Sequence, residues 1–412
     1  MLLAACALVA AGLLIGGLPG CAGEPARTHA TQPQLRVGCS GDYSPFALAD
    51  KRGALHGFDV DLARAYAADR GLELVLVRFR WAELERDLQA GRFDLAWSGV
   101  TVRPERSVVG RFAVPTAQTG AVVLVPTEAG LRELSDLDRP GLRLAVNQGG
   151  HLERVARGRF PRARIVAVAR NQRVLDALRE GLADAVVSDG LEAPHWMARS
   201  QRPLRLIGPF THDWKAPWAR PELRARVEDL SRWLVERELD GSLAALRARH
   251  GLANHPRTAL PEAALTAARE ERLGLMPWVA EAKRRRGDPI KVPEREAVVR
   301  SAGLQAVHRA ARLLGREPPT DAEILRFYQR EIEAAKQLQG RVLSGPPRRG
   351  PIPDLETALR PALLRIGERI AWLLAWRAPP TSAARGEVGQ QPLAVGIELG
   401  RGAALLRVVH PR

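Results

Sequence analysis

The chain changes its hydrophobic pattern near residue 252, and this change constrains the fold more than any other feature. From Leu35 to about Leu252, short β-rich runs alternate with amphipathic segments. After Leu252 the strand-like runs stop and long amphipathic segments follow. Alternating strands and helices are typical of α/β layers with mostly parallel sheets, and successive amphipathic helices are typical of a helical body. The sequence therefore predicts an α/β body followed by an all-α body.

Eight runs in the first body are predicted to be strands, and the amphipathic segments between them include 58–70, 81–90 and 171–182. The strand predictions cover residues 35–39, 73–79, 93–99, 121–125, 142–147, 164–169, 184–188 and 204–207. The pattern starts again near Leu142, so more than one sheet is expected.

The second body is predicted to contain helices over 260–286, 293–314, 320–342 and 354–377. Thr320 followed by Glu323 predicts a capping box at the start of the third helix. Proline inside a helix removes a hydrogen bond and bends or ends the helix. We therefore expect Pro277 to bend the first helix, and Pro361 either to kink the fourth helix or to mark its true start.

Three cations in the second body have a spacing that suits a pocket for a small dianion. Arg272 and Lys283 are eleven residues apart, which at about 100° per residue returns to almost the same side of a helix. Arg295 follows in the opening turn of the next helix, which begins with Pro293. Charges on an apolar stripe are costly unless a ligand or partner compensates them. The alternative is an arginine-rich amphipathic helix with a slightly different inner stripe. The apolar residues that would share the face are Leu265, Ala268, Met276 and Val279.

The formal net charge of +16 does not by itself indicate a nucleic-acid partner. Arginines are scattered among acidic residues, and no long basic run exists beyond 283–286. Lysine is scarce and occurs at positions 51, 215, 283, 291 and 336. The excess of arginine is therefore a general compositional bias, and a lysine at position 283, where the spacing favours a cation, is informative.

The N-terminal run over 2–18 is apolar and is similar to an export signal. The segment ending in Cys21 resembles a bacterial lipoprotein cleavage box, in which Cys21 would carry the lipid. Pro19 is unusual in such a box, and no lysine or arginine precedes the run. With Cys6 and Cys21 in this leader, Cys39 is the remaining cysteine, so neither a disulfide framework nor a cysteine metal cluster is expected. The chain is predicted to be exported, either periplasmic or tethered to a membrane by lipid.

Motifs of the first body resemble those of the polar-amino-acid solute-binding proteins. They are Val-Gly-Cys-Ser-Gly-Asp-Tyr-Ser-Pro-Phe at 37–46, Gly-Phe-Asp-Val-Asp-Leu at 57–62, Phe-Asp-Leu-Ala-Trp-Ser-Gly at 93–99 and Thr-Val-Arg-Pro-Glu-Arg at 101–106. The resemblance implies two α/β lobes that close on a ligand around a hinge. It also implies that Arg106 clamps a ligand carboxylate and that Asp189 pairs with a ligand amino group.

Within that family, four features resemble the cyclohexadienyl dehydratases, which form an aromatic ring by removing water and carbon dioxide from prephenate or arogenate. The resemblance implies that Glu192 is a general acid kept protonated by an apolar pocket. The same resemblance assigns substrate contacts to Asp42, Tyr43, Trp81 and Asn147. The features are Gly-Asp-Tyr-Ser-Pro-Phe at 41–46, Trp81, Ala-Val-Asn-Gln-Gly-Gly at 145–150 and Ser-Asp-Gly-Leu-Glu-Ala at 188–193.

Two positions depart from the dehydratase pattern. Ala121 stands where those enzymes have a lysine, and His151 stands where they have a threonine. We therefore expect the cleft to lack a cation that would hold a dianion. His151 would compensate in part if protonated, or would simply cap the following helix.

The second body resembles the secreted all-helical chorismate mutases, which rearrange chorismate to prephenate without a cofactor. The resemblance implies that Lys283 and Gln339 donate to the ether oxygen and that Glu296 contacts the substrate hydroxyl. Carboxylates would be held by Arg272, Arg295 and Arg360, with Arg365 as the alternative to Arg360. Val292 and Ala335 replace polar residues of the family pattern, which would trim contacts without removing the cations.

These resemblances together imply an exported bifunctional enzyme of phenylalanine biosynthesis, because the product of the helical body is the substrate of the lobed body. The predicted parts are a signal peptide (1–21), a two-lobe domain (33–252), a mutase domain (258–380) and a tail (381–412). In the tail, 393–399 and 403–409 form either a hairpin or loose chain. Small-molecule substrates are expected, and no metal, cofactor or nucleic acid. The alternative is a solute-binding lipoprotein without dehydratase activity, whose helical body is a mutase or an adaptor.

Overall fold

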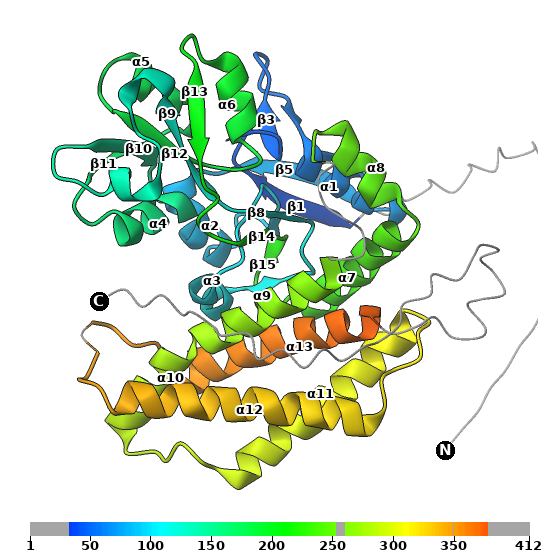
Figure 1. Cartoon of the computed structure of the whole chain (residues 1–412). Coiled ribbons are helices and arrows are strands. Elements are labelled where there is room, and N and C mark those ends of the chain that lie inside the picture. The colour runs from blue at the N-terminus through cyan, green and yellow to red at the C-terminus, as the bar shows by residue number, and fades with distance from the viewer. Residues whose placement is uncertain (1–32, 253–259, 349, 378–412) are drawn as a thin grey trace, which may run out of the picture.

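The computed structural model describes residues 33–252, 260–348 and 350–377. Two α/β lobes lie on one side of the molecule and an all-helical body lies on the other (Figure 1). The two-part fold class predicted from the sequence is confirmed. The predicted signal peptide, the lipidation of Cys21 and the C-terminal tail lie outside the described residues.

The first lobe is built on a sheet in which four strands run in the same direction and one, β15 (Trp218–Ala219), is antiparallel to its neighbours. A small three-stranded sheet, β2 (Asp42–Tyr43), β3 (Ala47–Ala49) and β4 (Leu55–His56), precedes α1 (Phe58–Asp69). In spatial order the main sheet contains β5 (Glu73–Arg78), β1 (Gln34–Cys39), β6 (Leu95–Ala96), β15 (Trp218–Ala219) and β7 (Arg111–Phe112). The lobe also holds η1 (Trp81–Glu83), α2 (Leu84–Gln89), α3 (Pro104–Val109), α7 (Arg224–Leu239) and α8 (Ser242–Arg249).

The second lobe is built on a five-stranded sheet whose three central strands are buried. Its order is β11 (Arg164–Val168), β10 (Arg143–Asn147), β12 (Ala185–Asp189), β9 (Ala121–Pro126) and β13 (Leu204–Ile207). The helices are α4 (His151–Arg159), α5 (Val174–Arg179) and α6 (Ala193–Arg199). The second sheet already includes β9, so it begins before Leu142, the position where the sequence pattern starts again.

The chain crosses between the lobes on two short strands that pair antiparallel. β8 (Ala117–Thr119) leads into the second lobe and β14 (Asp213–Lys215) leads back from it. Lys215 also forms a bridge to Thr101 of the first lobe. The sequence prediction missed both strands, because three residues are too few to show a period-two pattern. These strands form the hinge between the lobes.

The helical body contains five α-helices in the described part of the chain rather than the predicted four. They are α9 (Leu260–Gly274), α10 (Met276–Arg286), α11 (Pro293–Leu313), α12 (Asp321–Leu343) and α13 (Arg360–Arg377), with one π-helical turn, η5 (Leu355–Leu359). None of the described helices combines the length and the apolar character needed to cross a bilayer.

Prolines explain where the helical predictions succeeded and failed. The prediction of one helix over 260–286 is wrong, because Pro277 lies in the first turn of α10 and a new helix starts there. Pro361 likewise lies at the start of α13 rather than at a kink. The capping box is confirmed, since the Thr320 hydroxyl accepts from the Glu323 amide at 3.3 Å and the Glu323 carboxylate accepts from the Thr320 amide at 2.9 Å.

The helical body is attached to the first lobe through α3. The buried carboxylate of Glu271 on α9 accepts a hydrogen bond from Ser107 on α3 and pairs with the buried Arg369 on α13. Arg365 on α13 donates to the carbonyl oxygens of Ser107 (2.8 Å) and Val108 (3.0 Å). Carbonyl groups at the end of a helix lack helical partners, and a guanidinium satisfies them. These contacts fix α9 and α13 against α3, as Figure 1 shows.

Two helices of the helical body approach closely where a glycine faces an aromatic ring. Gly303 on α11 is buried, and a Cβ atom added there would lie 2.4 Å from the ring of Tyr328 on α12. Tyr328 is itself buried from solvent, and a shift of its ring away from an added Cβ atom would change its packing against α11.

We expect Gly303→Ala to lower the free energy of unfolding of the helical body by about 1–3 kcal/mol through this overlap. The measurement is urea unfolding followed by circular dichroism. Gly340→Ala is the matched control, because a Cβ atom there meets nothing within 4 Å, and alanine raises helix stability by up to about 1 kcal/mol. Equal stability of Gly303→Ala and the unmodified protein would contradict the close contact.

Candidate functional site

The helical body contains a cavity of about 510 Å³ between its helices. Apolar side chains such as Met276, Val279 and Ile332 make up much of its wall. All six residues that the sequence assigned to the site of the helical body lie on that wall. They are Arg272, Lys283, Arg295, Glu296, Gln339 and Arg360.

The four predicted cations of the cavity come from four different helices. Arg272 is near the end of α9, Lys283 is on α10, Arg295 is in the first turn of α11 and Arg360 begins α13. Arg272 is buried, and its Nη1 has no hydrogen-bond partner among the described residues. Burial lowers the pKa of Arg272 below its usual value. An unpaired buried guanidinium nitrogen is costly, and an anionic ligand would compensate it.

Lys283 is half-buried at the side of the cavity. Its Nζ donates to the carbonyl oxygen of Ile290 at 3.1 Å, which leaves further donors for a ligand. Burial, and then the positive charge of Arg360, lower the pKa of Lys283. A cation held in this way interacts more strongly with a negative oxygen than it would in water.

The amide and acid groups of the cavity also point inward. Gln339 on α12 is buried, and its Oε1 has no hydrogen-bond partner among the described residues. The Gln339 Nε2 contacts Met276 Sδ at 3.5 Å, a weak interaction that an oxygen ligand would replace. Glu296 pairs with Lys336 at 3.3 Å and keeps one buried oxygen unpaired. Val292 and Ala335, which replace polar residues of the family pattern, also lie on the wall.

The alternative between Arg360 and Arg365 is resolved by their positions. Arg360 lies on the cavity wall and pairs with Glu356. Arg365 points to the end of α3 in the first lobe and is not among the residues that line the cavity. In total, seven cationic and two anionic side chains line the cavity. Such an excess of positive charge suits a small ligand with two negative groups.

The second candidate site lies in the cleft between the lobes, which are in contact with each other. The backbone amide of Asn171 in the second lobe donates to Asp42 Oδ2 of the first lobe at 3.1 Å. Trp81 Nε1, also in the first lobe, donates to Asp42 Oδ1 at 3.1 Å. An ion pair between Arg154 and Glu105 also crosses the cleft. The cavity left between the lobes measures about 30 Å³, room for about one water molecule. A ligand of several carbons therefore requires the lobes to separate.

Arg106 on α3 lies on the wall of this cleft cavity, with Tyr43 and Asn147. Its Nη1 donates to the Thr101 carbonyl at 2.9 Å, and its guanidinium lies over the Trp218 ring at 5.8 Å. The Arg106 Nε and the Asn147 Oδ1 are buried without partners among the described residues. Burial lowers the pKa of Arg106 to about 9. The arrangement holds donors ready for a carboxylate.

Glu192 is 1% exposed and is held by two hydrogen bonds. Asn171 Nδ2 donates to Oε1 at 2.6 Å, and Ser188 Oγ donates to Oε2 at 3.0 Å. Burial, with the nearby charge of Asp189, raises the pKa of Glu192 well above its usual value. Asn171 lies on the wall of the cleft cavity and connects Glu192 to it. A carboxyl group held in its acid form can deliver a proton to a departing hydroxyl.

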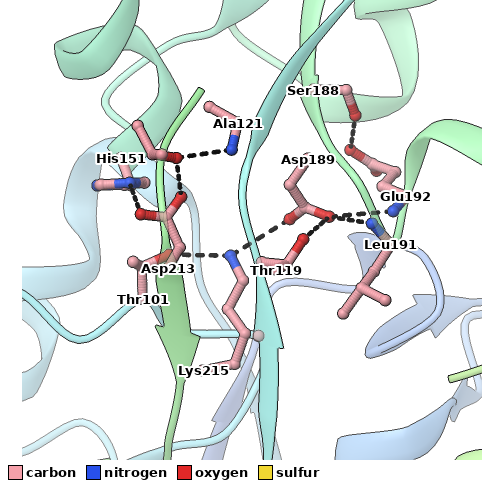
Figure 2. A network of polar contacts seen from close by, with 12 residues as sticks. Thr101, Thr119, Ala121, His151, Ser188, Asp189, Leu191, Glu192, Asp213 and Lys215 are labelled. Carbon is pink, nitrogen blue, oxygen red and sulfur yellow. Dashed lines mark hydrogen bonds and ion pairs between the residues drawn. The ribbon is translucent and has the colours of Figure 1, made fainter. Parts of the chain in front are cut away.

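Asp189 is fully buried and has a partner that the sequence did not predict. Lys215 Nζ, on the hinge strand β14, lies 3.2 Å from Asp189 Oδ2 and 2.9 Å from Thr101 Oγ1 (Figure 2). The Asp189 Oδ1 accepts from the amides of Leu191 (2.9 Å) and Glu192 (3.0 Å). Ala121 leaves the position of the dehydratase lysine without a cation, but Lys215 lies on the wall of the cleft cavity and brings a cation that the sequence did not predict.

His151, the other departure from the dehydratase pattern, is paired with an acid of the hinge. Its Nε2 lies 3.1 Å from Asp213 Oδ1 (Figure 2). Burial lowers the pKa of His151 in spite of this carboxylate. His151 is also the first residue of α4, but no hydrogen bond from its ring caps that helix. His151 therefore helps to fix β14, the strand that carries Lys215.

The sequence analysis did not predict two residues of the cleft, Asn171 and Lys215. Asn171 had no signal, because it lies in the short 3-10 turn η4 (Asn171–Arg173) before α5. Lys215 had a compositional signal, since the chain has five lysines among 62 basic residues. Lys215 lines one cavity, and Lys283 and Lys336 line the other.

Comparison with known proteins identifies relatives of the first body. Residues 35–253 match the bacterial extracellular solute-binding proteins, family 3. The chain is 37% identical over 161 residues to cyclohexadienyl dehydratase of Pseudomonas aeruginosa. The matched region covers 39% of this chain and 60% of that protein. It is 30% identical over 172 residues to a probable amino-acid ABC transporter-binding protein of Haemophilus influenzae, covering 41% and 65%. The chain thus spans less than two thirds of each of these relatives.

Solved structures show the same relationship. The ancestral amino acid-binding protein AncCDT-1, a precursor of cyclohexadienyl dehydratase, is 30% identical with a TM-score of 0.50, covering 53% of this chain and 95% of that one. A putative binding component of an ABC transporter from Wolinella succinogenes, complexed with lysine, has the same identity, TM-score and coverage. Both likenesses concern about half of the chain.

Proposed function

The chain belongs to the bacterial extracellular solute-binding proteins, family 3, and from this premise we propose that it is an exported enzyme catalysing two consecutive steps. The helical body converts chorismate to prephenate. The lobed body converts prephenate, or arogenate, to phenylpyruvate or phenylalanine. The observation that carries the proposal is the convergence of the six predicted mutase residues on one cavity. The likeness of the lobed body to a cyclohexadienyl dehydratase supports the second step.

The first step is a rearrangement that needs binding and electrostatics but no proton transfer. Arg272, Arg295 and Arg360 hold the two carboxylates so that the side chain folds over the ring. As the ether carbon–oxygen bond breaks and the new carbon–carbon bond forms, negative charge grows on the ether oxygen. Lys283 and Gln339 donate to that oxygen and stabilise the transition state more than the bound substrate.

The second step needs an acid in the cleft. Arg106 binds a substrate carboxylate, and the protonated Glu192 gives its proton to the ring hydroxyl. Water leaves as the carbon–oxygen bond breaks, the ring carboxylate departs as carbon dioxide, and its bonding electrons complete the aromatic ring. Asn171 and Ser188 orient the Glu192 carboxyl group. The burial of Glu192 supports this role, because a solvated carboxyl group would be ionised at neutral pH.

The second candidate function is a solute-binding lipoprotein whose cleft binds an amino acid without turnover. Arg106 and Asp189, the residues that would hold an α-carboxylate and an α-ammonium, favour it, as does the likeness to amino-acid binding proteins. Purified protein given chorismate separates the two. Loss of chorismate absorbance without formation of phenylpyruvate would keep the mutase and reject the dehydratase.

Lys283→Ala should lower kcat for chorismate loss by about 10²–10³-fold, because one of the donors to the ether oxygen is removed. Phenylpyruvate formation from added prephenate should be unaffected. Lys291→Ala is the matched control, since Lys291 is an exposed lysine in the segment between α10 and α11. Unchanged chorismate loss in Lys283→Ala would reject the mutase site.

Glu192→Gln should abolish phenylpyruvate formation and make prephenate accumulate from chorismate, because an amide of the same shape cannot give up a proton in this way. The products are separated by chromatography. Glu128→Gln, at an exposed glutamate of the same lobe, should behave as the unmodified protein. Undiminished dehydration in Glu192→Gln would show that another group supplies the proton.

Both steps should lose activity as the pH rises. Lys283 donates only as an ammonium group, and burial lowers its pKa. The mutase rate should therefore begin to fall at a pH below the usual lysine pKa of about 10.4. Glu192 acts only when protonated and its pKa is raised by burial, so dehydration should persist well above the usual glutamate pKa of about 4.3 and fall as the pH exceeds the raised value. Separate pH–rate profiles test this, and Lys283→Arg should remove the alkaline limb of the mutase profile.

A further inference from the structure

Lys215 brings a cation to the one carboxylate of the cleft that the family resemblance assigned to a ligand amino group. It is 3% exposed, and its Nζ contacts Asp189 at 3.2 Å and Thr101 at 2.9 Å. The ammonium group also lies 5.2 Å from the centre of the Tyr43 ring, a favourable position for a cation. Contacts to both lobes and an aromatic face hold Lys215 in place.

Asp189 already has an ammonium partner, Lys215, before any ligand binds. Its Oδ2 pairs with Lys215, and its Oδ1 accepts two backbone amides and is 3.4 Å from the Thr119 hydroxyl. A carboxylate and an ammonium group in contact neutralise each other's charge. A ligand ammonium placed beside Asp189 would therefore meet the ammonium of Lys215, and like charges in a desolvated site repel strongly.

Arg106 gives the remaining wall of the cleft cavity a net positive charge, because Asp189 offsets the charge of Lys215. Lys215 and Asn147 still line the cavity and offer polar groups. An ammonium group has three donors, of which Asp189 and Thr101 use two. The third is available to a carboxylate or oxo oxygen.

We propose that Lys215 is a specificity-determining residue that makes the cleft select 2-oxo dicarboxylates and exclude their 2-ammonium counterparts. The inference rests on the proposed dehydratase function and adds a substrate class to it. Prephenate and arogenate differ at this one position, where prephenate has an oxo group and arogenate has an ammonium group. Lys215 stands where the ammonium of arogenate would have to bind, so prephenate is the substrate.

The test is isothermal titration calorimetry on the full chain carrying Glu192→Gln, which blocks turnover, and Arg295→Ala, which weakens prephenate binding in the helical cavity, with prephenate and arogenate as ligands. Prephenate should bind at least about tenfold more tightly than arogenate. Adding Lys215→Met should reverse this order, because Asp189 becomes free to pair with ammonium and the oxo acid loses a donor. Lys215→Arg, which keeps the charge, should keep the preference for prephenate. Binding in the helical cavity is the same in all three variants, so differences between them report on the cleft.

Equal or tighter binding of arogenate in the protein with Glu192→Gln and Arg295→Ala overturns the proposal, and this outcome needs no Lys215 variant to fold. An unchanged ratio in a Lys215→Met protein with a normal thermal transition also overturns it. The proposed dehydratase fails in a different way, namely when the unmodified protein forms no phenylpyruvate from prephenate. The calorimetric comparison decides the selectivity of the cleft in that case as well.

Discussion

The buried contact of Glu271 with Ser107 and Arg369 determines how the two bodies of this protein are assembled. Arg369 and Ser107 compensate the Glu271 carboxylate, which is fully removed from water. Burial raises the pKa of Glu271, and the two partners oppose that effect. Removing one partner of such a group costs about 3–5 kcal/mol. The next residue after Glu271 is Arg272 of the helical cavity, and the residue before Ser107 is Arg106 of the cleft. One contact therefore fixes the helices that carry an arginine of each site.

The buried charges of the two sites differ in how far the chain compensates them. Asp189 is paired with Lys215 and accepts two backbone amides. By contrast, nitrogen atoms of Arg272 and Arg106 are buried without a partner in the described chain, and each faces a cavity. A folded protein keeps such groups only where something else offsets the cost. Both unpaired guanidinium groups fit a carboxylate ligand, in agreement with the two substrates proposed.

Periodicity and punctuation predicted several elements, including the start of α12 at its capping box and the strands β1, β10 and β13. They failed at the break between α9 and α10 and where an element is too short to show a period, as in the hinge strands β8 and β14. The spacing argument for one helix face is wrong, because Arg272 lies on α9 and Lys283 on α10; the residues of the helical cavity were foreseen from the family resemblance. Lys215 was missed because it meets Asp189 through the crossing of two distant strands, and no local pattern of either residue records that contact.

The attachment of the helices to α3 has a mechanical consequence. The hinge strands β8 and β14 allow the lobes to separate, whereas the contacts of α9 and α13 run to the lobe that contains α3. On opening, the first lobe and the helical body would move together as one rigid unit. The second lobe, built on the sheet of β9 to β13, would rotate relative to that unit. A ligand bound in the helical cavity would therefore keep its surroundings while the cleft between the lobes opens and closes.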